Sequence, residues 1–144
     1  MKLSHVTESK TEASGASDAT SHGASYGASY GTMVDVSEKK VTFRMAHARS
    51  VVRIPESLRS LIKDGEIQSK KGPVFNTAIV AGTQAVKNTS SLIPFCHPLA
   101  IESCKFEITT KDSDIIIDCR VGLHHKTGVE MEALTGASVA ALTI

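Results

Sequence analysis

The sequence predicts an α+β fold in which one antiparallel sheet packs against helices. Two segments, 104–109 and 115–121, alternate strictly between apolar and polar residues and are joined by the short polar link 111–114, which predicts a hairpin of two strands. Two further segments, beginning at 73 and 127, carry apolar and small residues at helical spacing. Strands interleaved with helices along one short chain are typical of a two-layer α+β domain.

The composition indicates one folded domain preceded by a tail. The chain has 144 residues, 41% hydrophobic and 22% charged, which is an ordinary globular balance. Residues 1–32 are dominated by Ser, Ala, Gly and Thr, so we expect a disordered tail there. A mitochondrial presequence is the less favoured alternative, because no arginine precedes Arg44. We expect residues 33–144 to form a single α+β domain.

The charge and the apolar pattern exclude several classes of partner. Sixteen Lys and Arg against fifteen Asp and Glu leave a net charge of +1, so no global field attracts nucleic acid, and an anionic ligand needs a local cluster of cations. No apolar run reaches the roughly 18 residues that cross a bilayer, and the N-terminus lacks a secretory core. We therefore expect a cytoplasmic protein without nucleic-acid or membrane partners, and three reduced cysteines.

Short apolar runs predict extended segments before the first long helix, at 34–36, 41–43 and 51–54. The polar stretch 45–50 is expected to interrupt them. Pro55 then opens a short helix that ends at Asp64-Gly65.

The two long helices start with different signals. Pro73 suits the first turn of a helix, and a stripe of Ala and Gly residues along that helix predicts close contact with another element. At the start of the last helix, Thr127 and Glu130 fit the T-x-x-E capping box. The chain stops at Ile144 inside an unbroken helical pattern.

The segment 94–98 is the most unusual stretch of the sequence. Prolines on both sides of His97 stiffen the backbone that presents this imidazole. A rigidly presented imidazole suits phosphate binding or proton transfer. A histidine that merely satisfies a loop carbonyl is an equally favoured alternative.

Two further clusters of charge lie next to helix starts. Lys70 and Lys71 precede the first long helix, where cations beside free amides can hold phosphate, although an exposed loop with solvated lysines is the commoner meaning. Glu130 and Glu132 lie two residues apart at the start of the last helix. On a regular helix they point to nearly opposite sides, so they can line the same pocket only if the first turn is distorted. The alternative is that they face different subunits.

Metal binding and thiol chemistry are the weaker alternatives. Cys96, His97 and the His124-His125 pair lack the paired spacing of structural zinc sites, so we expect no metal site. A nucleophilic Cys96–His97 pair is also disfavoured, because neighbours in sequence seldom point at one another. A non-catalytic nucleotide-binding protein remains an alternative from a different class.

Long and specific strings occur in three places: MVDVSEKKVTFR at 33–44, KKGPVFNTAIVAGTQAVKNTSSLIPFCHPL at 70–99 and KTGVEMEALTGASVAALTI at 126–144. Together they resemble the cyclic pyranopterin monophosphate synthase family of molybdenum cofactor biosynthesis. The resemblance implies a lyase that converts 3′,8-cyclo-7,8-dihydroguanosine 5′-triphosphate into cyclic pyranopterin monophosphate and releases pyrophosphate. It also implies a ferredoxin-like fold and a homohexamer, built as a trimer of dimers with active sites at the dimer interfaces.

The resemblance assigns site residues by motif position. It implies four catalytic residues, Lys71, His97, Glu130 and Glu132. It implies that substrate is bound by Arg44, Lys70, Cys96, His97, Lys126 and Met131. No cofactor is expected, with a divalent ion beside the triphosphate left open, and the expected partners are the small-molecule substrate and, functionally, the radical enzyme that produces it.

The family's last helix continues past L-T-I into a D-M-x-K segment whose aspartate and lysine also belong to the active site. The sequence ends at Ile144, before both. We therefore expect a catalytic domain truncated at its C-terminus, which binds the triphosphate but turns it over poorly.

Overall fold

Strand β6 (Asp114–His125) lies at the centre of a three-stranded antiparallel sheet in the computed structural model, which describes residues 31–144. Strand β1 (Thr42–Arg53) pairs with one edge of β6 and strand β5 (Ser103–Lys111) with the other, in the order β1-β6-β5. Residues 1–30, which are most of the expected tail, lie outside the described residues. The predicted hairpin between β5 and β6 is confirmed, since Lys111 pairs with Asp114 across its turn.

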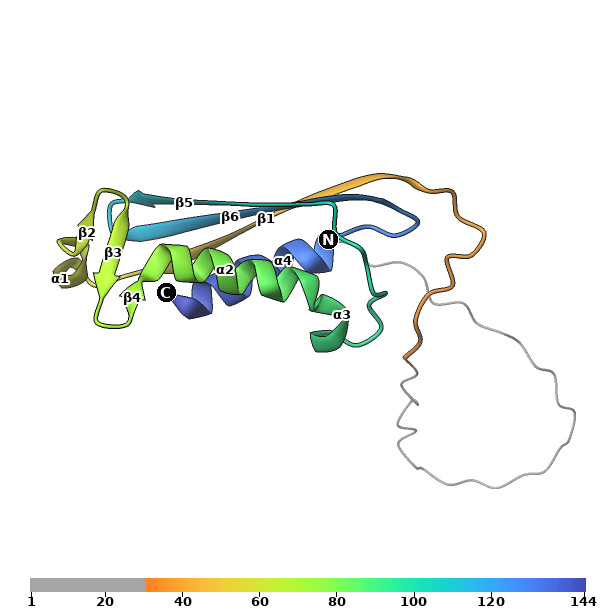
Figure 1. Ribbon diagram of the computed structural model, residues 1–144, viewed down its shortest axis with the longest axis horizontal. Helices are drawn as coiled ribbons and strands as arrows, with labels where there is room; N and C mark the ends of the chain where they lie inside the picture. The colour runs from red at the N-terminus through yellow and green to blue at the C-terminus, as the bar shows by residue number, and fades with distance from the viewer. Residues whose placement is uncertain (1–30) are drawn as a thin grey trace, which may run out of the picture. The chain divides into compact units, whose positions relative to one another are not determined.

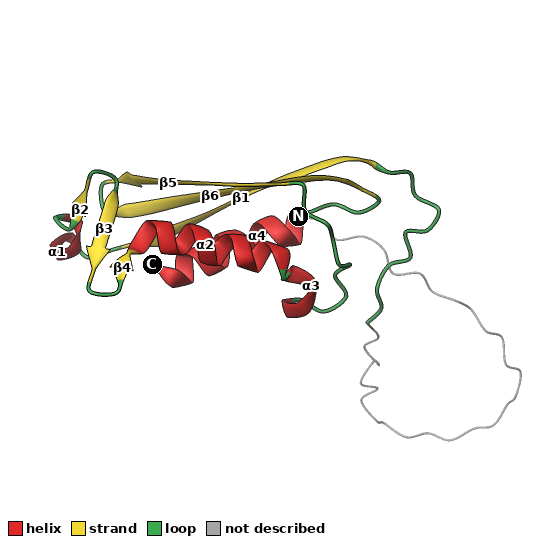
Figure 2. Ribbon diagram, in the orientation of Figure 1, coloured by secondary structure: helices red, strands yellow, loops and turns green. Residues whose placement is uncertain are grey.

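Two long helices, α2 (Val74–Lys87) and α4 (Glu130–Thr143), lie side by side on one face of this sheet (Figures 1 and 2). A short helix, α3 (Thr89–Leu92), follows α2. The main elements run β1-α2-β5-β6-α4, and this order with the strand order of the sheet fits a ferredoxin-like arrangement. The predicted α+β fold is confirmed. None of the helices in the described part of the chain is long and apolar enough to cross a membrane.

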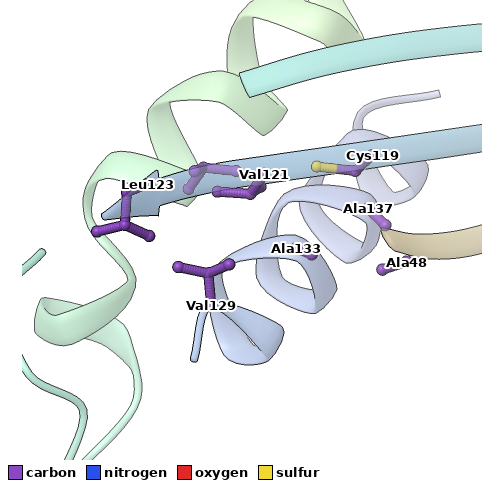
Figure 3. Close-up of a cluster of buried hydrophobic side chains, with 8 residues drawn as sticks. Ala48, Cys119, Val121, Leu123, Val129, Ala133 and Ala137 are labelled. Atoms are coloured by element: carbon purple, nitrogen blue, oxygen red, sulfur yellow. The ribbon is translucent and has the colours of Figure 1, made fainter. Parts of the chain in front are cut away.

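The core lies between the sheet and the two helices. Alternate residues of β6 point to this side and are at most 1% exposed, as the sequence pattern predicts: Ile115, Ile117, Cys119, Val121 and Leu123. Figure 3 shows the part of this core where β6 and Ala48 of β1 meet Val129, the N-cap of α4, and Ala133 and Ala137 within α4. Burial raises the pKa of the Cys119 thiol to about 12, so Cys119 is a core residue and not a reactive thiol.

Glycines let the two helices approach closely. A Cβ atom on Gly136 of α4 would lie 2.5 Å from Cγ2 of Val86 on α2, and one on Gly82 would lie 3.0 Å from the carbonyl oxygen of Gly136. Neither distance leaves room for a side chain. The small-residue stripe of α2 therefore has the close contact that the sequence predicts.

A small second sheet covers one end of α2. It consists of β2 (Ile62–Lys63), β3 (Glu66–Ser69) and β4 (Gly72–Pro73) and follows the four-residue helix α1 (Glu56–Arg59). The expectation of a helix reaching to Asp64-Gly65 is wrong. Both of these residues have positive φ, 51° and 74°, and form the two-residue turn between β2 and β3. Aspartate followed by glycine is a strong signal for a type I′ hairpin turn, and here that signal overrides the helical spacing.

Strand β1 also differs from the sequence prediction. It runs without interruption through the polar stretch 45–50, whereas residues 34–36 form no strand. Two polar side chains of this stretch, His47 and Arg49, point to the sheet face away from the helices, where they bind the carboxylate of Asp118 on β6. A third, Ser50, points to the helix side and donates to the Ala137 carbonyl oxygen of α4 at 2.8 Å. Because Asp118 lies about 70 residues further along the chain, local polarity is a poor guide here.

Candidate active site

Four basic side chains surround an open hollow of about 370 Å³ at the end of the sheet where β1 begins and β6 ends. They are Lys39, Arg44, His97 and Lys126. The rest of its lining comes from Thr32, Val34, Val36, Phe95, Thr127 and Gly128. No Asp or Glu is among the described residues that line this cationic hollow, so its charge favours an anionic ligand.

Each cation is brought there by a different segment. Arg44 is on β1 opposite Leu123, so it points to the helix side of the sheet. His97 follows α3, and Lys126 follows the last residue of β6. Within residues 31–144, Nε of Arg44 is buried without a hydrogen-bond partner. A buried donor without a partner is costly, and an anion in the hollow can supply the acceptor.

The loop before β1 completes the cationic hollow. Nζ of Lys126 donates to the carbonyl oxygen of Ser37 at 2.6 Å, and the Asp35 carboxylate accepts from the Ser37 amide at 2.8 Å. The Lys39 amide donates to the Val36 carbonyl oxygen at 3.1 Å. These bonds shape the loop that carries Lys39 to the hollow. Sequence reasoning missed Lys39, because one lysine in a polar loop carries no local signal.

A second hollow, of about 210 Å³, adjoins the first and shares Phe95, His97, Thr127 and Gly128 with it. We call it the acidic hollow. Its remaining lining consists of Cys96, Leu99, Glu130, Met131 and Glu132. Glu130 and Glu132 therefore line the same hollow, which the sequence allows only if the first turn of the helix is distorted.

The reason lies in how α4 begins. The helix starts at Glu130 and its N-cap is Val129, without a side-chain cap, so the predicted capping box of Thr127 and Glu130 is wrong. Instead the Thr127 hydroxyl lies 3.2 Å from Nδ1 of His125. The Glu130 carboxylate folds back over Gly128 and leaves no room there for a Cβ atom. Glu130 therefore reaches the side of the helix on which Glu132 lies.

Glu132 is the buried acid of the pair. It is 4% exposed, and burial, helped by the negative charge of Glu130, raises its pKa above the usual range for a glutamate. Burial and the charge of Glu132 likewise raise the pKa of the Cys96 thiol. Cys96 thus lines the hollow as a neutral thiol, and Glu132 is suited to hold or release a proton.

Phe95 stands between the two hollows and lines both. Its φ of 63° places a bulky side chain in the left-handed region, which is rare and strained for any residue other than glycine. The side chain is nevertheless exposed. The strained backbone and the flanking prolines present both Phe95 and His97 at this junction.

Lys70 and Lys71 lie far from both hollows. They form the turn between β3 and β4, at the start of α2, whereas His97 follows α3 beyond the other end of that helix (Figure 1). The 14 residues of α2 separate the two regions by about 20 Å, which is more than a lysine side chain spans.

The Lys71 region is well defined. Lys71 lines a separate hollow of about 260 Å³ with Gly72, Thr77 and the end of α4. The Ser69 hydroxyl accepts from the Lys71 amide at 3.1 Å and donates to the Gly72 carbonyl oxygen at 2.9 Å. The φ of Gly72 is 117°, which favours glycine at this position. One chain thus carries the two halves of the expected site at opposite ends.

The alternative metal site does not assemble. Within residues 31–144 no three His, Cys, Asp or Glu side chains converge as metal ligands do. His124 instead pairs with Glu102, whose carboxylate lies 3.0 Å from Nδ1 and also accepts from the His124 amide.

The fold and the two hollows define an α+β protein in which a hollow lined by four basic side chains adjoins a hollow that contains a buried acid. A sequence model of the MoaC family matches residues 33–144. The chain is 55% identical over 130 residues to "Molybdenum cofactor biosynthesis protein 1" of Dictyostelium discoideum, an alignment that covers 78% of this chain and 21% of that protein.

Shorter relatives match as well. The "Cyclic pyranopterin monophosphate synthase" of Xanthomonas campestris pv. campestris (strain 8004) is 54% identical over 114 residues, covering 78% of this chain and 69% of that protein. The protein of the same name from Clostridium perfringens is 52% identical over 114 residues, with 71% of its length covered. The chain belongs to the MoaC family, as the three sequence strings predict.

Proposed function

We propose that this chain is an enzyme that converts 3′,8-cyclo-7,8-dihydroguanosine 5′-triphosphate to cyclic pyranopterin monophosphate with release of pyrophosphate. We assign the reaction to residues 33–144. The observation that carries the proposal is the cationic hollow, free of described carboxylates, directly beside the acidic hollow that contains Glu132. The family membership and the printed names of the relatives support it.

The cationic hollow is suited to the triphosphate. Forming a cyclic phosphate requires a sugar hydroxyl oxygen to bond to the α-phosphorus while the bond to the departing pyrophosphate breaks. Arg44 offers a planar donor set for phosphate oxygens, and Lys39, Lys126 and His97 add donors around it. Fixed cations of this kind stabilise the negative charge that builds up on the leaving group.

The acidic hollow is suited to the ring system of the substrate. Rearranging a purine-derived ring into a pterin moves protons between ring nitrogens, carbons and oxygens. It therefore needs acid and base groups whose pKa values lie close to neutral pH. Glu132, with its raised pKa, is able to exchange a proton with the ring. Glu130, Cys96 and Met131 line the same hollow and hold the ring beside it.

We propose further that the active site is shared between two copies of the chain. Lys71 is the catalytic lysine by motif position, with Lys70 beside it, yet both lie about one helix length from His97 in the same chain. A second copy can bring its own Lys71 to the hollows of the first. Such an arrangement is compatible with a closed dimer and with a trimer of dimers.

The remaining proposals concern the cellular setting. We propose a cytoplasmic homohexamer, supplied with substrate by a radical enzyme. We propose that the reaction needs no resident cofactor; assays with and without a chelator will decide whether a divalent ion accompanies the triphosphate.

The proposal is tested by incubating the purified chain with the cyclic triphosphate and measuring pyrophosphate and the pterin product. Under single-turnover conditions, with the chain in excess over the triphosphate, we expect slow but stoichiometric formation of both in the wild type and loss of both in His97→Ala. Lys111→Ala is the matched control, because Lys111 is an exposed lysine at the β5–β6 turn and lines none of the three hollows. Tight binding of the triphosphate without any product would favour the alternative of a nucleotide-binding protein.

A further inference from the structure

Helix α2 begins without a cap of its own. Its N-cap is Pro73, which makes no side-chain capping bond. The first amides of any helix lack partners within the helix, and an N-cap side chain normally accepts from the second or third of them. In α2 those amides belong to Phe75 and Asn76. Their partner has to come from elsewhere.

Glu66, on the neighbouring strand β3, supplies it. Its Oε1 accepts from the Phe75 amide at 2.7 Å and its Oε2 from the Asn76 amide at 3.0 Å. Oε1 also accepts from the Ile67 amide at 2.7 Å. Burial alone would raise the pKa of Glu66, but the backbone amides around the carboxylate outweigh it and lower the pKa, so the group is ionised at neutral pH.

This contact does more than cap a helix, because it crosses the base of the turn that carries Lys70 and Lys71. The strands on either side of that turn pair through Ser69 with Gly72, and the Ser69 hydroxyl bridges the turn itself. Glu66 closes the other end of the loop by tying β3 to the first turn of α2. The Lys70–Lys71 turn is thus held by the Ser69–Gly72 pairing on one side and by the Glu66 carboxylate, bound to the first turn of α2, on the other.

We propose that Glu66 is a positioning residue for Lys71: its carboxylate clamps strand β3 to the start of α2 and thereby fixes the direction in which the Lys70–Lys71 turn presents its side chains. The inference rests on the proposed function, in which Lys71 acts on the substrate. It assigns a role in the reaction to a residue that touches neither substrate nor hollow.

The test separates the clamp from the cap. Pro73→Asp places an acceptor at the N-cap itself, within the helix's own chain, and leaves Glu66 in place. The double variant Glu66→Ala with Pro73→Asp keeps a capped helix but loses the link to β3. Compared with Pro73→Asp alone, we expect kcat of the double variant to fall about 10- to 100-fold, the cost of a misplaced catalytic group. KM and the melting temperature should change little.

A conservative variant provides the matched control. Glu66→Gln keeps one acceptor oxygen for the Phe75 and Ile67 amides but turns an NH2 donor toward the Asn76 amide, so we expect kcat to lie between those of the wild type and the double variant. Hydrogen exchange of the amides at 70–72 is measured on all variants without substrate, and we expect faster exchange only where the clamp is lost.

Equal kcat in the double variant and in Pro73→Asp would overturn the inference, because Glu66 would then be only a helix cap. A loss of kcat that merely follows a loss of folded protein would overturn it as well. The proposed function fails separately, if the wild type forms no product. In that case the exchange data alone still decide whether Glu66 holds the turn.

Discussion

The pair of Asp118 with Arg49 gives the fold a pH-dependent stability that can be calculated. Asp118 is 3% exposed, and its two carboxylate oxygens accept from Nε and Nη2 of Arg49 at 2.9 Å each. These bonds, with a smaller contribution from His47 and against the opposing effect of burial, lower the pKa of Asp118 from 3.8 to about 2.

The magnitude and the sign follow from linkage. A pKa lowered by about 1.8 units corresponds to at most about 2.4 kcal/mol of folding free energy. Because the Arg49 side chain is 56% exposed and the His47 side chain 41%, water screens the pair and we expect about 1 to 2 kcal/mol. Between pH 3.8 and about 2 the unfolded chain binds the proton and the folded chain does not. This stability is therefore present above that range and is lost as the pH falls through it.

Asp118→Asn tests the calculation through urea unfolding. We expect the variant to be about 1 to 2 kcal/mol less stable than wild type near pH 7, with roughly half of that difference gone by about pH 3. Glu107→Gln is the control, since Glu107 forms an exposed pair with Arg120 at 3.3 Å and should show little difference at either pH. A difference between Asp118→Asn and wild type that is the same at both pH values would show that the charge of Asp118 does not supply this stability.

Three further outcomes are expected. Gly136→Ala should lower the free energy of unfolding by up to about 2 kcal/mol, because overpacking against α2 outweighs the gain of about 1 kcal/mol in helix propensity. The control, Ser138→Ala at an exposed position of the same helix, should not lower it. Stabilisation by Gly136→Ala would show that the two helices can move apart to make room. Lys71→Ala should abolish turnover while changing stability by no more than about 0.5 kcal/mol, with a milder effect for Lys70→Ala; equal losses would mean that only local charge matters. Arg44→Ala should weaken triphosphate binding by about 1.5 to 3 kcal/mol in calorimetry and make the binding affinity less dependent on salt concentration. Unchanged binding would show that Arg44 does not contact the triphosphate.

Sequence reasoning predicts elements well where the pattern reflects burial. Strands β5 and β6 alternate because one face packs on the helices, and that alternation is visible in the chain. It fails for β1, where His47 and Arg49 bind Asp118, far along the sequence. It also fails at Asp64-Gly65, where two local signals compete and the hairpin turn prevails.

The site is predictable in its parts but not in its arrangement. Short motifs identify Arg44, His97 and the two glutamates, because each motif lies within one segment. The folded-back side chain of Glu130, the contribution of Lys39 and the distance from Lys71 to His97 all depend on how distant segments meet. No local sequence pattern predicts contacts between such distant segments.

Mixing two inactive variants tests the shared active site most directly. Lys71→Ala and His97→Ala are each expected to be inactive, because each removes one half of every site. If Lys71 of one copy completes the hollows of another, random exchange of subunits between dimers leaves one intact site in about half of them, so activity should return to about a quarter of the wild-type value. If subunit exchange is verified by mass and no activity returns, the two residues do not act across copies, and the account of the site is wrong.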